Sequence, residues 1–474
     1  PLLPVAGLCT LVATSRCLRG AFDHPEVWKN LVFERFIECG AKNSPSGSKD
    51  YDGTNDSPPI LNFRNTWKET FAFQYLGADE NQSNGSRPGH RMMEEHRSDL
   101  TTVIDELRNI FSGNIVRSSQ YLRSISTMDG VDISLGKFVR GFEKKNRPVI
   151  LRQVSKAFVD QPELWKVQRL KKAFHDQHFH VNAWGRKSDL RMTLPSFLNY
   201  VRKAYLDLDP LYLFDPRIPD DLLVTLRKPD FMPIDLLDDI EDRKQKKYSL
   251  SSNSSTSEVE KRGQKRRRSR NIEERNHGIF KETRWLLIGG RGSGTRFHFD
   301  PHAVSAWSLC MEGKKLWFLW PPIGSTWGKG RHNYPLPPGI DNPFAGKTAN
   351  GNGGVGTWFK RFLLPLLRSL VSTRDLDLPG VKVTYKEKAP NERLEVSDER
   401  VLYWGVQNEG DLVFVPSGWF HTVLNLETSV ALTRWFVTSR QARNTINAVC
   451  SYDKLAAEYL RRVIQKLHQD DDSE

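Results

Sequence analysis

The stretch GSGTRFHFDPHAVSAW, Gly292–Trp307, decides which fold and which site this sequence predicts. It places His298 and Asp300 two residues apart, beside phenylalanines and directly after a glycine-rich turn. Successive side chains of a β-strand point to opposite faces of the sheet, so a strand here turns the imidazole and the carboxylate to one side. Three interpretations are open: a polar outer face over a buried aromatic one, a hydrogen-bonded pair in a core, or two ligands of a metal ion.

A second histidine favours the metal-ligand interpretation. His421 lies in VPSGWFHTVLNL, Val415–Leu426, where a Pro-Ser-Gly turn precedes an apolar run that predicts another strand. Two histidines and one carboxylate on neighbouring strands form the facial triad of non-haem Fe(II) oxygenases, which leaves open positions for a co-substrate and dioxygen. Three protein ligands and a water also characterise catalytic zinc sites, so these residues alone leave the metal open.

Short strands dominate the middle of the chain. The runs are β-branched or aromatic and are bounded by Gly, Pro or Asp: RPVIL, HFHVNAW, PLYLFD, RWLLIGG, AVSAWSLCM, KKLWFLW, DLVFVP, HTVLNL and SVALTRWF. Many closely spaced strands predict a sandwich or barrel, and a jelly roll is favoured because the helical stretches lie outside the run. The predicted fold is therefore mainly β, with peripheral helices and a small helical N-terminal region.

Charge and cysteine usage limit the compartment and the partners. The chain has 474 residues and a formal net charge of +13, and KRGQKRRRSR, Lys261–Arg270, concentrates basic residues in a disordered insertion predicted at about residues 244–278. This run predicts a nuclear-localisation or nucleic-acid-binding segment, or else a solvated loop, and gives no support for specific nucleic-acid readout. Five scattered cysteines favour a reducing compartment, so the nucleus or the cytoplasm is expected. No run approaches the roughly 20 apolar residues of a membrane span.

The N-terminal segment, residues 1–40, is predicted to be helical. Leu8, Leu11 and Val12 form one apolar stripe, and Trp28, Leu31 and Phe33 supply a second. Its Leu-Pro, Ser-Arg-Cys and Trp-x-x-Leu progression resembles the F-box, whose first helix would precede Pro1. That resemblance implies a Skp1-type adaptor as partner, and the alternative is a small helical cap on the main domain.

The strand-rich region, about residues 130–440, resembles a known family. GTRFHFDPHAVSAWSLCMEGKKLWFLWPP and DLVFVPSGWFHTVLNL are similar to the jumonji-C 2-oxoglutarate oxygenases, within them to the phosphatidylserine-receptor-like subgroup described as arginine demethylases and lysyl hydroxylases. The resemblance implies a double-stranded β-helix, the cupin-like form of the jelly roll. It also implies Fe(II) held by the catalytic residues His298, Asp300 and His421, with 2-oxoglutarate and dioxygen as co-substrates.

The resemblance marks a cation for the distal carboxylate of 2-oxoglutarate. Lys315 follows the predicted hairpin turn Glu312-Gly313 and occupies the family's lysine position. The alternative is a solvated turn lysine, but Lys314 already provides a soluble charge there and the residues after Lys315 are apolar. We therefore expect Lys315 to be buried and to bind the co-substrate.

Four further residues occupy co-substrate positions of the family, and three of them match the family's residue types. Thr295 and Tyr212 match hydroxyls that hold the same carboxylate, and Asn425 matches a polar position with the parity of His421. Ser308 departs from the asparagine that the subgroup commonly carries. Strict alternation places Thr295 opposite His298, so its role requires an irregular backbone, which the glycines before it would permit.

The implied reaction is oxidation of a C–H bond in a protein substrate. Oxidation of an N-methyl group releases formaldehyde, whereas oxidation of a side-chain methylene leaves an alcohol, so one site supports demethylation or hydroxylation. Basic proteins or peptides, histones among them, are the predicted substrates, and the acidic run IDLLDDIED, Ile234–Asp242, either attracts them or faces solvent. The alternative function is an F-box-type substrate receptor of a ubiquitin ligase that uses the jumonji-C domain as a binding platform.

Two regions flank this domain. Residues 41–129 are predicted to be a linker with a helical stretch, and residues 441–474 a C-terminal helical region. In YDKLAAEYLRRVIQKLHQ, helical spacing puts five apolar residues along one side: Leu455, Tyr459, Val463, Ile464 and Leu467. This side docks on the core or makes homodimer contacts.

Overall fold

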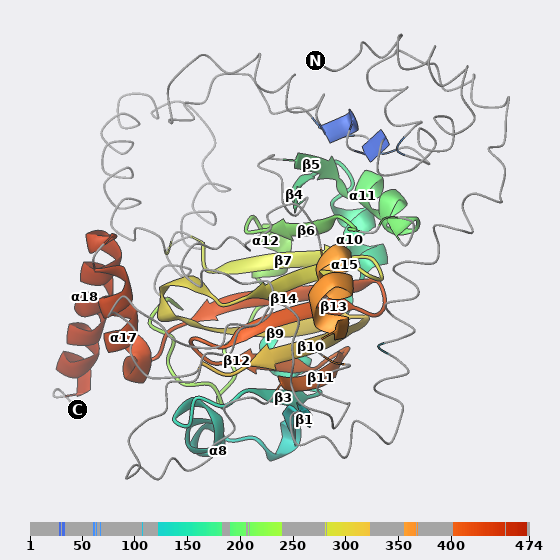
Figure 1. Cartoon of the computed structure of the whole chain (residues 1–474). Coiled ribbons are helices and arrows are strands. Elements are labelled where there is room, and N and C mark those ends of the chain that lie inside the picture. The colour runs from blue at the N-terminus through green and yellow to red at the C-terminus, as the bar shows by residue number, and fades with distance from the viewer. Residues whose placement is uncertain are drawn as a thin grey trace, which may run out of the picture.

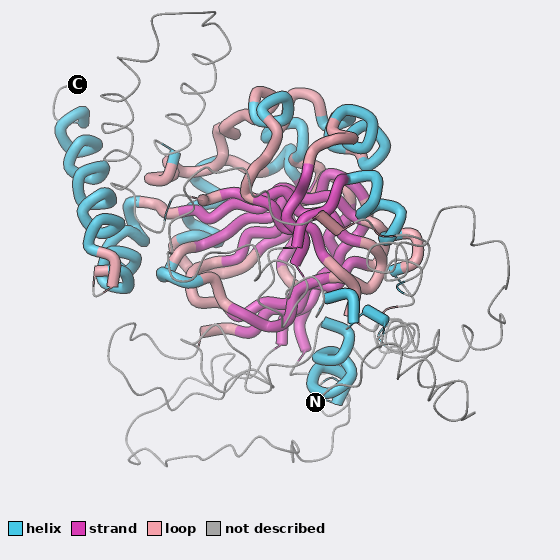
Figure 2. Tube along the Cα trace, turned by 90° about the horizontal axis from the view of Figure 1, so that it is seen from above, coloured by secondary structure: helices cyan, strands magenta, loops and turns pink. Residues whose placement is uncertain are grey.

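The computed structural model describes residues 122–182, 190–204, 207, 209–238, 280, 282–322, 355–365, 367, 402–450 and 452–471. It also describes residues 28–29, 31–33, 60–61, 63, 67 and 107. The basic insertion predicted at about 244–278 lies outside the described residues. Two β-sheets form the centre of the molecule, and the helices surround them (Figures 1 and 2).

The larger sheet has nine strands. In spatial order they are β2 (Ser126–Asp129), β3 (Val149–Arg152), β12 (Leu412–Val415), β9 (Ser305–Glu312), β14 (Ser429–Phe436), β7 (Arg284–Gly289), β6 (Tyr212–Asp215), β4 (His178–Asn182) and β5 (Leu190–Thr193). The smaller sheet has five strands, in the order β1 (Leu122–Ser124), β11 (Leu402–Asn408), β10 (Lys314–Trp320), β13 (Phe420–Asn425) and β8 (Gly294–His298).

The chain passes repeatedly between the two sheets. From β7 to β10 successive strands alternate between the larger and the smaller sheet, and β12, β13 and β14 alternate in the same way. This winding is the double-stranded β-helix, so the predicted jelly roll is confirmed. Each predicted strand run is a strand, and β1, β2, β5 and β11 are additional.

Helices pack against the outer faces of both sheets, and a pair of helices lies at one end of them (Figure 1). The described helices are α8 (Leu135–Phe138), α9 (Ser155–Phe158), α10 (Val167–Ala173), α11 (Leu194–Val201), α12 (Asp220–Leu223), α15 (Val355–Trp358), α17 (Ser439–Val449) and α18 (Lys454–Asp471). Three 3-10 helices, η2 (Gly130–Asp132), η4 (Pro162–Trp165) and η7 (Pro301–Ala303), and two π-helices, η3 (Val139–Glu143) and η8 (Phe359–Leu363), are also described. None of the helices in the described part of the chain combines the length and apolar character that a bilayer crossing requires.

Alternation along β14 separates the main core from the interior of the barrel. Leu432 and Phe436 belong to the large apolar cluster beneath the helices, whereas Ala431 belongs to a cluster with Trp285 and Tyr212 inside the barrel. Burying one such large side chain contributes about 1.5–3 kcal/mol to the stability of the fold. The apolar cluster beneath the helices therefore fixes which side of each strand faces the interior of the barrel.

The described part of the N-terminal segment packs on the main core. Trp28, Val32 and Phe33 are buried in the same cluster as Trp67, and the Lys29 ammonium lies 3.1 Å from the Asp207 carboxylate. This packing agrees with the helical-cap alternative. The apolar stripe of Leu8, Leu11 and Val12 lies outside the described residues, so the F-box resemblance stays a prediction.

The C-terminal helices α17 and α18 lie side by side against the ends of the sheets (Figure 1). Tyr459 is buried and its hydroxyl donates to the Leu236 carbonyl at 3.0 Å, while Leu455 stays 41% exposed. Core docking is therefore confirmed, and homodimer contacts stay a prediction. The boundaries predicted for the four regions of the chain likewise stay predictions.

Phe414→Ala is expected to lower the free energy of unfolding by about 3–5 kcal/mol, because its fully buried ring packs against Phe138 at 5.0 Å and leaves a cavity when removed. Urea unfolding measures the change. Val131→Ala, at a residue that is 89% exposed, is the control and should stay within about 0.5 kcal/mol of wild type. Equal effects of the two substitutions would contradict the assignment of the core.

Candidate metal centre

The pairing of β8 with β13 brings the two histidines together. His298 lies opposite His421, and Thr295 lies opposite Val423. The chain therefore takes three residue steps along β8 where it takes two along β13. This extra residue is a β-bulge, and it turns Thr295 to the same face as His298. The irregular backbone that the role of Thr295 requires is therefore present, although it follows Thr295 instead of lying at the glycines before it.

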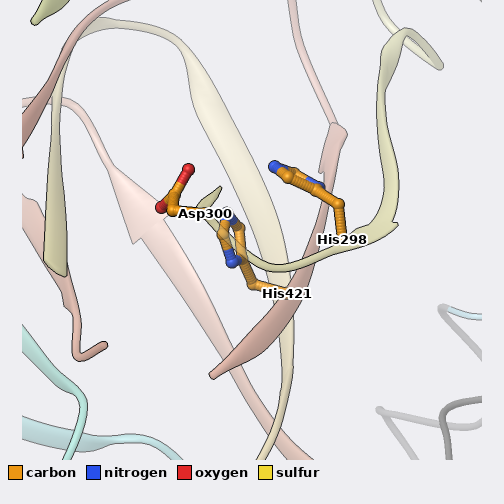
Figure 3. Close-up of side chains that lie close together, drawn as sticks. All are labelled: His298, Asp300 and His421. Carbon is orange, nitrogen blue, oxygen red and sulfur yellow. Dashed lines mark ion pairs between the residues drawn. The ribbon is translucent and has the colours of Figure 1, made fainter. Parts of the chain in front are cut away.

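Asp300 completes a three-residue cluster. One ligand atom from each of His298, Asp300 and His421 lies within 4.8 Å of the other two (Figure 3). His421 Nε2 is 4.0 Å from Asp300 Oδ2, and the two imidazole rings are 4.2 Å apart between centroids. The predicted convergence is thus confirmed, but β8 ends at His298 and Asp300 lies beyond it, in the extended residue before η7.

Backbone carbonyls fix the tautomer of both histidines. His298 Nδ1 lies 2.8 Å from the Arg296 carbonyl, and His421 Nδ1 lies 3.2 Å from the Trp419 carbonyl. A carbonyl oxygen can only accept, so each Nδ1 carries the proton and donates it. Each Nε2 is then left with a lone pair for a metal ion, which is the usual arrangement of metal-binding imidazoles.

Burial keeps His421 neutral. Desolvation, assisted by the neighbouring His298, lowers the pKa of His421 from 6.5 to about 4. A neutral imidazole is the form that binds metal, because protonation of Nε2 would remove the lone pair. His298 and Asp300 are half-buried, so the cluster has one closed side and one side open to solvent.

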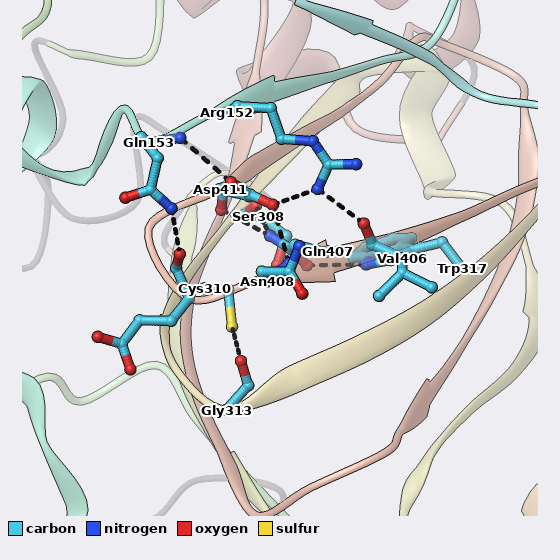
Figure 4. A network of polar contacts seen from close by, with 11 residues as sticks. Arg152, Gln153, Ser308, Cys310, Gly313, Trp317, Val406, Gln407, Asn408 and Asp411 are labelled. Atoms are coloured by element: carbon cyan, nitrogen blue, oxygen red, sulfur yellow. Dashed lines mark hydrogen bonds and ion pairs between the residues drawn. The ribbon is translucent and has the colours of Figure 1, made fainter. Parts of the chain in front are cut away.

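A buried polar network includes Trp317, whose ring lies beside His421 (Figure 4 shows the network). The Trp317 indole lies nearly parallel to the His421 ring, at 27° and 6.1 Å between centroids. Trp317 Nε1 donates to Gln407 Oε1 at 2.8 Å, and Gln407 Nε2 donates to the carbonyls of Ser308 and Asp411 at 2.7 and 2.8 Å. Gln407 therefore ties the smaller sheet to the larger one. This role of Gln407 was not predicted from the sequence, although a lone amide within an apolar run is the available signal.

The same network is anchored at its outer edge by Asp411, which is 1% exposed. Its carboxylate pairs with Arg152 and accepts from the backbone N–H groups of Gln153 and Asn408 at 3.1 and 2.9 Å. Because the polar groups of Gln407 and Asp411 all have partners, the network holds the side chains at this end of the barrel in fixed positions.

Lys315 is buried without a counter-ion. It is 2% exposed, and its ammonium donates to the Tyr212 hydroxyl at 3.1 Å. Among the described carboxylates none lies within 4.0 Å of it. A buried unpaired ammonium is costly, so this position suits an anionic ligand. The solvated alternative for Lys315 is wrong, and Tyr212 lies beside it as expected.

Thr295 offers a second unsatisfied group on the same inner face. Its side chain is 8% exposed, and Oγ1 is buried without a hydrogen-bond partner among the described residues. Buried hydroxyls are rarely left unpaired, and a carboxylate oxygen would satisfy this one. Lys315, Tyr212 and Thr295 therefore agree with the predicted cradle for a carboxylate.

Asn425 and Ser308 already have protein partners. Asn425 lies opposite Lys315 across the sheet, donates to Ser293 Oγ at 2.8 Å and accepts from Ser429 Oγ at 2.8 Å. Ser308 Oγ accepts from Thr433 Oγ1 at 2.9 Å. Their predicted contacts with the co-substrate stay predictions, and Thr433 is a further interior hydroxyl that only the strand pairing reveals.

The family follows from comparison with known proteins. A model described as a cupin-like domain matches residues 136–442. The chain belongs to this cupin-like domain family. The matched residues include all three members of the cluster and the buried lysine, so the cupin-like domain carries the whole site.

Three curated relatives of this cupin-like chain have informative names. It is 23% identical to the arginine-specific demethylase JMJ22 of Arabidopsis thaliana, over 90% of this chain and 63% of the relative. It is 25% identical to the bifunctional arginine demethylase and lysyl-hydroxylase psr-1 of Caenorhabditis elegans, over 65% of this chain and 60% of the relative. It is 29% identical to the 2-oxoglutarate and iron-dependent oxygenase JMJD4 of Gallus gallus, over 32% of this chain and 26% of the relative.

These names agree with the jumonji-C resemblance, which is confirmed at the level of the family. The chain spans about three fifths of the length of the first two relatives.

Metal-free protein is expected to lose stability as the pH falls from about 6.5 towards about 4. In that window His421 takes up a proton in the unfolded chain but not in the folded protein, so proton binding stabilises the unfolded state relative to the folded one. Between about pH 7 and about pH 5 this group contributes a loss on the order of 2 kcal/mol.

Urea unfolding of chelator-treated protein at the two pH values measures this loss. His421→Asn should reduce the loss, and His175→Asn, at an exposed histidine paired with Asp176, is the control. The same loss in wild type and His421→Asn would contradict a buried neutral His421.

Proposed function

We propose that the chain is an Fe(II)- and 2-oxoglutarate-dependent oxygenase that acts on a protein substrate. The observation that carries the proposal is the combination, inside one barrel, of the three-residue cluster and the buried Lys315, which bonds to Tyr212 but has no carboxylate partner among the described residues. A metal site alone would also suit zinc, whereas an added carboxylate cradle suits a co-substrate with two acidic ends. The activities for which the three relatives are named support the same proposal.

The residues present fit iron and 2-oxoglutarate. Two imidazole nitrogens and one carboxylate oxygen are the facial set of non-haem iron enzymes. When bound, iron with 2-oxoglutarate and dioxygen supplies an oxidant for C–H bonds. Lys315 and Tyr212 would hold the distal carboxylate, and the Thr295 hydroxyl would donate a hydrogen bond to it. The apolar interior beside Trp317 would exclude water from the reacting centre.

The proposed substrates are arginine N-methyl groups or lysine side chains of basic proteins, histones among them. The same hydroxylation step releases formaldehyde from an N-methyl group and leaves an alcohol on a methylene, so one centre serves both reactions. The names of the demethylase JMJ22 and of the demethylase and lysyl-hydroxylase psr-1, the two relatives that match over more of the chain, support these substrate classes.

The acidic run Ile234–Asp242 gives this substrate choice no support in its described part. The Arg434 guanidinium lies 2.8 Å from Asp235 and 2.7 Å from Asp238, and Lys228 lies 3.0 Å from Asp238. Asp235 is also buried, and desolvation raises its pKa to about 6. These carboxylates neutralise neighbouring cations of the same chain.

We also propose a nuclear location, supported by the basic run Lys261–Arg270, which lies outside the described residues. Binding of a Skp1-type adaptor, the ubiquitin-ligase receptor function and nucleic-acid binding by the insertion stay predictions.

Purified protein is expected to convert 2-oxoglutarate to succinate in an iron-dependent manner when histone-tail peptides are supplied. His298→Ala and Asp300→Ala should each abolish turnover, because each removes one of three protein ligands. Mass spectrometry of the peptides then distinguishes loss of a methyl group from gain of oxygen. Succinate production that survives both substitutions would contradict the assignment of the metal ligands.

Lys315→Met is expected to raise the KM for 2-oxoglutarate by about 10- to 100-fold, the size of a lost charge-assisted hydrogen bond. Lys314→Met is the matched control, because the Lys314 side chain is 41% exposed and pairs with Glu427 at 3.3 Å. Steady-state kinetics with varied 2-oxoglutarate measures both. An equal KM in the two variants would contradict the carboxylate cradle.

A further inference from the structure

The two oxygens of the Asp300 carboxylate have different surroundings. Oδ1 accepts a hydrogen bond from Trp435 Nε1 at 3.1 Å. Oδ2 faces the histidines and lies 4.0 Å from His421 Nε2. An indole N–H donates only, so it competes with a metal ion for Oδ1 and leaves Oδ2 available.

The Trp435 ring is held in place from several sides. Its backbone N–H donates to the Thr283 carbonyl at 2.8 Å, and its ring meets Trp285 edge-on at 4.8 Å between centroids. His302 packs edge-on against it at 5.5 Å, so the direction of the N–H is set by packing.

The turn after Asp300 is held in a strained conformation. His302 and Ala303 have φ angles of 67° and 55°, in the left-handed region that residues other than glycine rarely adopt. The Ala303 carbonyl accepts from Ser417 Oγ at 2.9 Å and from Thr445 Oγ1 of α17 at 3.1 Å. Strain of this kind persists only where neighbouring structure imposes it, and it gathers at functional sites.

We infer that Trp435 is a positioning residue that makes Asp300 a single-oxygen metal ligand. By occupying Oδ1, it would prevent both carboxylate oxygens from binding one metal ion and so would keep one more coordination position open for the co-substrate. The strained turn, clamped by α17, holds the carboxylate where Trp435 can reach it. This inference rests on the proposed metal centre and adds a residue that donates a hydrogen bond to one of its ligands, Asp300.

Trp435→Phe removes the N–H and keeps an aromatic ring. Cobalt(II) is the probe, because its visible absorption reports the number of ligands and is independent of turnover. We expect about tenfold weaker cobalt(II) binding, as for the loss of other groups that orient metal ligands. We also expect a lower molar absorptivity, because the freed Oδ1 joins the metal and raises its coordination number.

Trp165→Phe is the matched control. Trp165 is fully buried and its Nε1 donates to Thr225 Oγ1 at 3.2 Å, in the main core. This variant should match wild type in affinity within about twofold and in its spectrum. If Trp435→Phe also matches wild type, or if both variants change equally, the inference is overturned. Wild-type protein that binds no cobalt(II) would instead contradict the proposed metal centre.

A second substitution covers poor folding of Trp435→Phe. Replacing Trp435 alone by 3-benzothienylalanine keeps the bicyclic shape and exchanges the N–H for sulfur. The same fall in absorptivity is expected, and an unchanged spectrum in this variant overturns the inference.

Discussion

His298 and His421 face each other because β8 and β13 pair in one register, and the remaining site residues take their places from that pairing. A slip of one residue would turn an entire set of side chains to the other face. The bulge in β8 adds Thr295 to the inner face, and the pairing of β13 with β10 adds Lys315. The neighbouring strands β8, β13 and β10 therefore place the metal cluster and the anion-binding Lys315 on the same inner face of the barrel.

The barrel interior contains polar groups that have hydrogen-bond partners and others that lack them among the described residues. Gln407 is fully buried and uses both ends of its amide, so it joins the two sheets at little cost. Lys315 and Thr295 are also buried, yet the lysine has no carboxylate partner and the hydroxyl has no partner at all among the described residues. Burying such groups lowers stability, and a co-substrate that pairs with both would recover that free energy on binding.

Most strands could be predicted because β-branched and aromatic residues favour strands, and the cluster could be predicted because histidine and aspartate are common metal ligands. Two of the missed strands are short and mostly polar, LRS in β1 and STMD in β2, whereas β11 was missed although its sequence LYWGVQN is seven residues long and contains two aromatic residues. The bulge that turns Thr295 is visible only in the pairing with β13, since nothing in the local alternation signals an extra residue. Trp435 bonds to Asp300, 135 positions away, and Gln407 bonds to Trp317, 90 positions away. No local pattern encodes such contacts.

We propose that the metal cluster and Lys315 form one site for one co-substrate. The most direct test is the affinity for 2-oxoglutarate under anaerobic conditions, measured by titration calorimetry with and without manganese(II). A shared site predicts that the metal tightens 2-oxoglutarate binding by about tenfold or more, and that 2-oxoglutarate tightens metal binding by the same factor. Equal 2-oxoglutarate affinity with and without the metal would contradict the shared site.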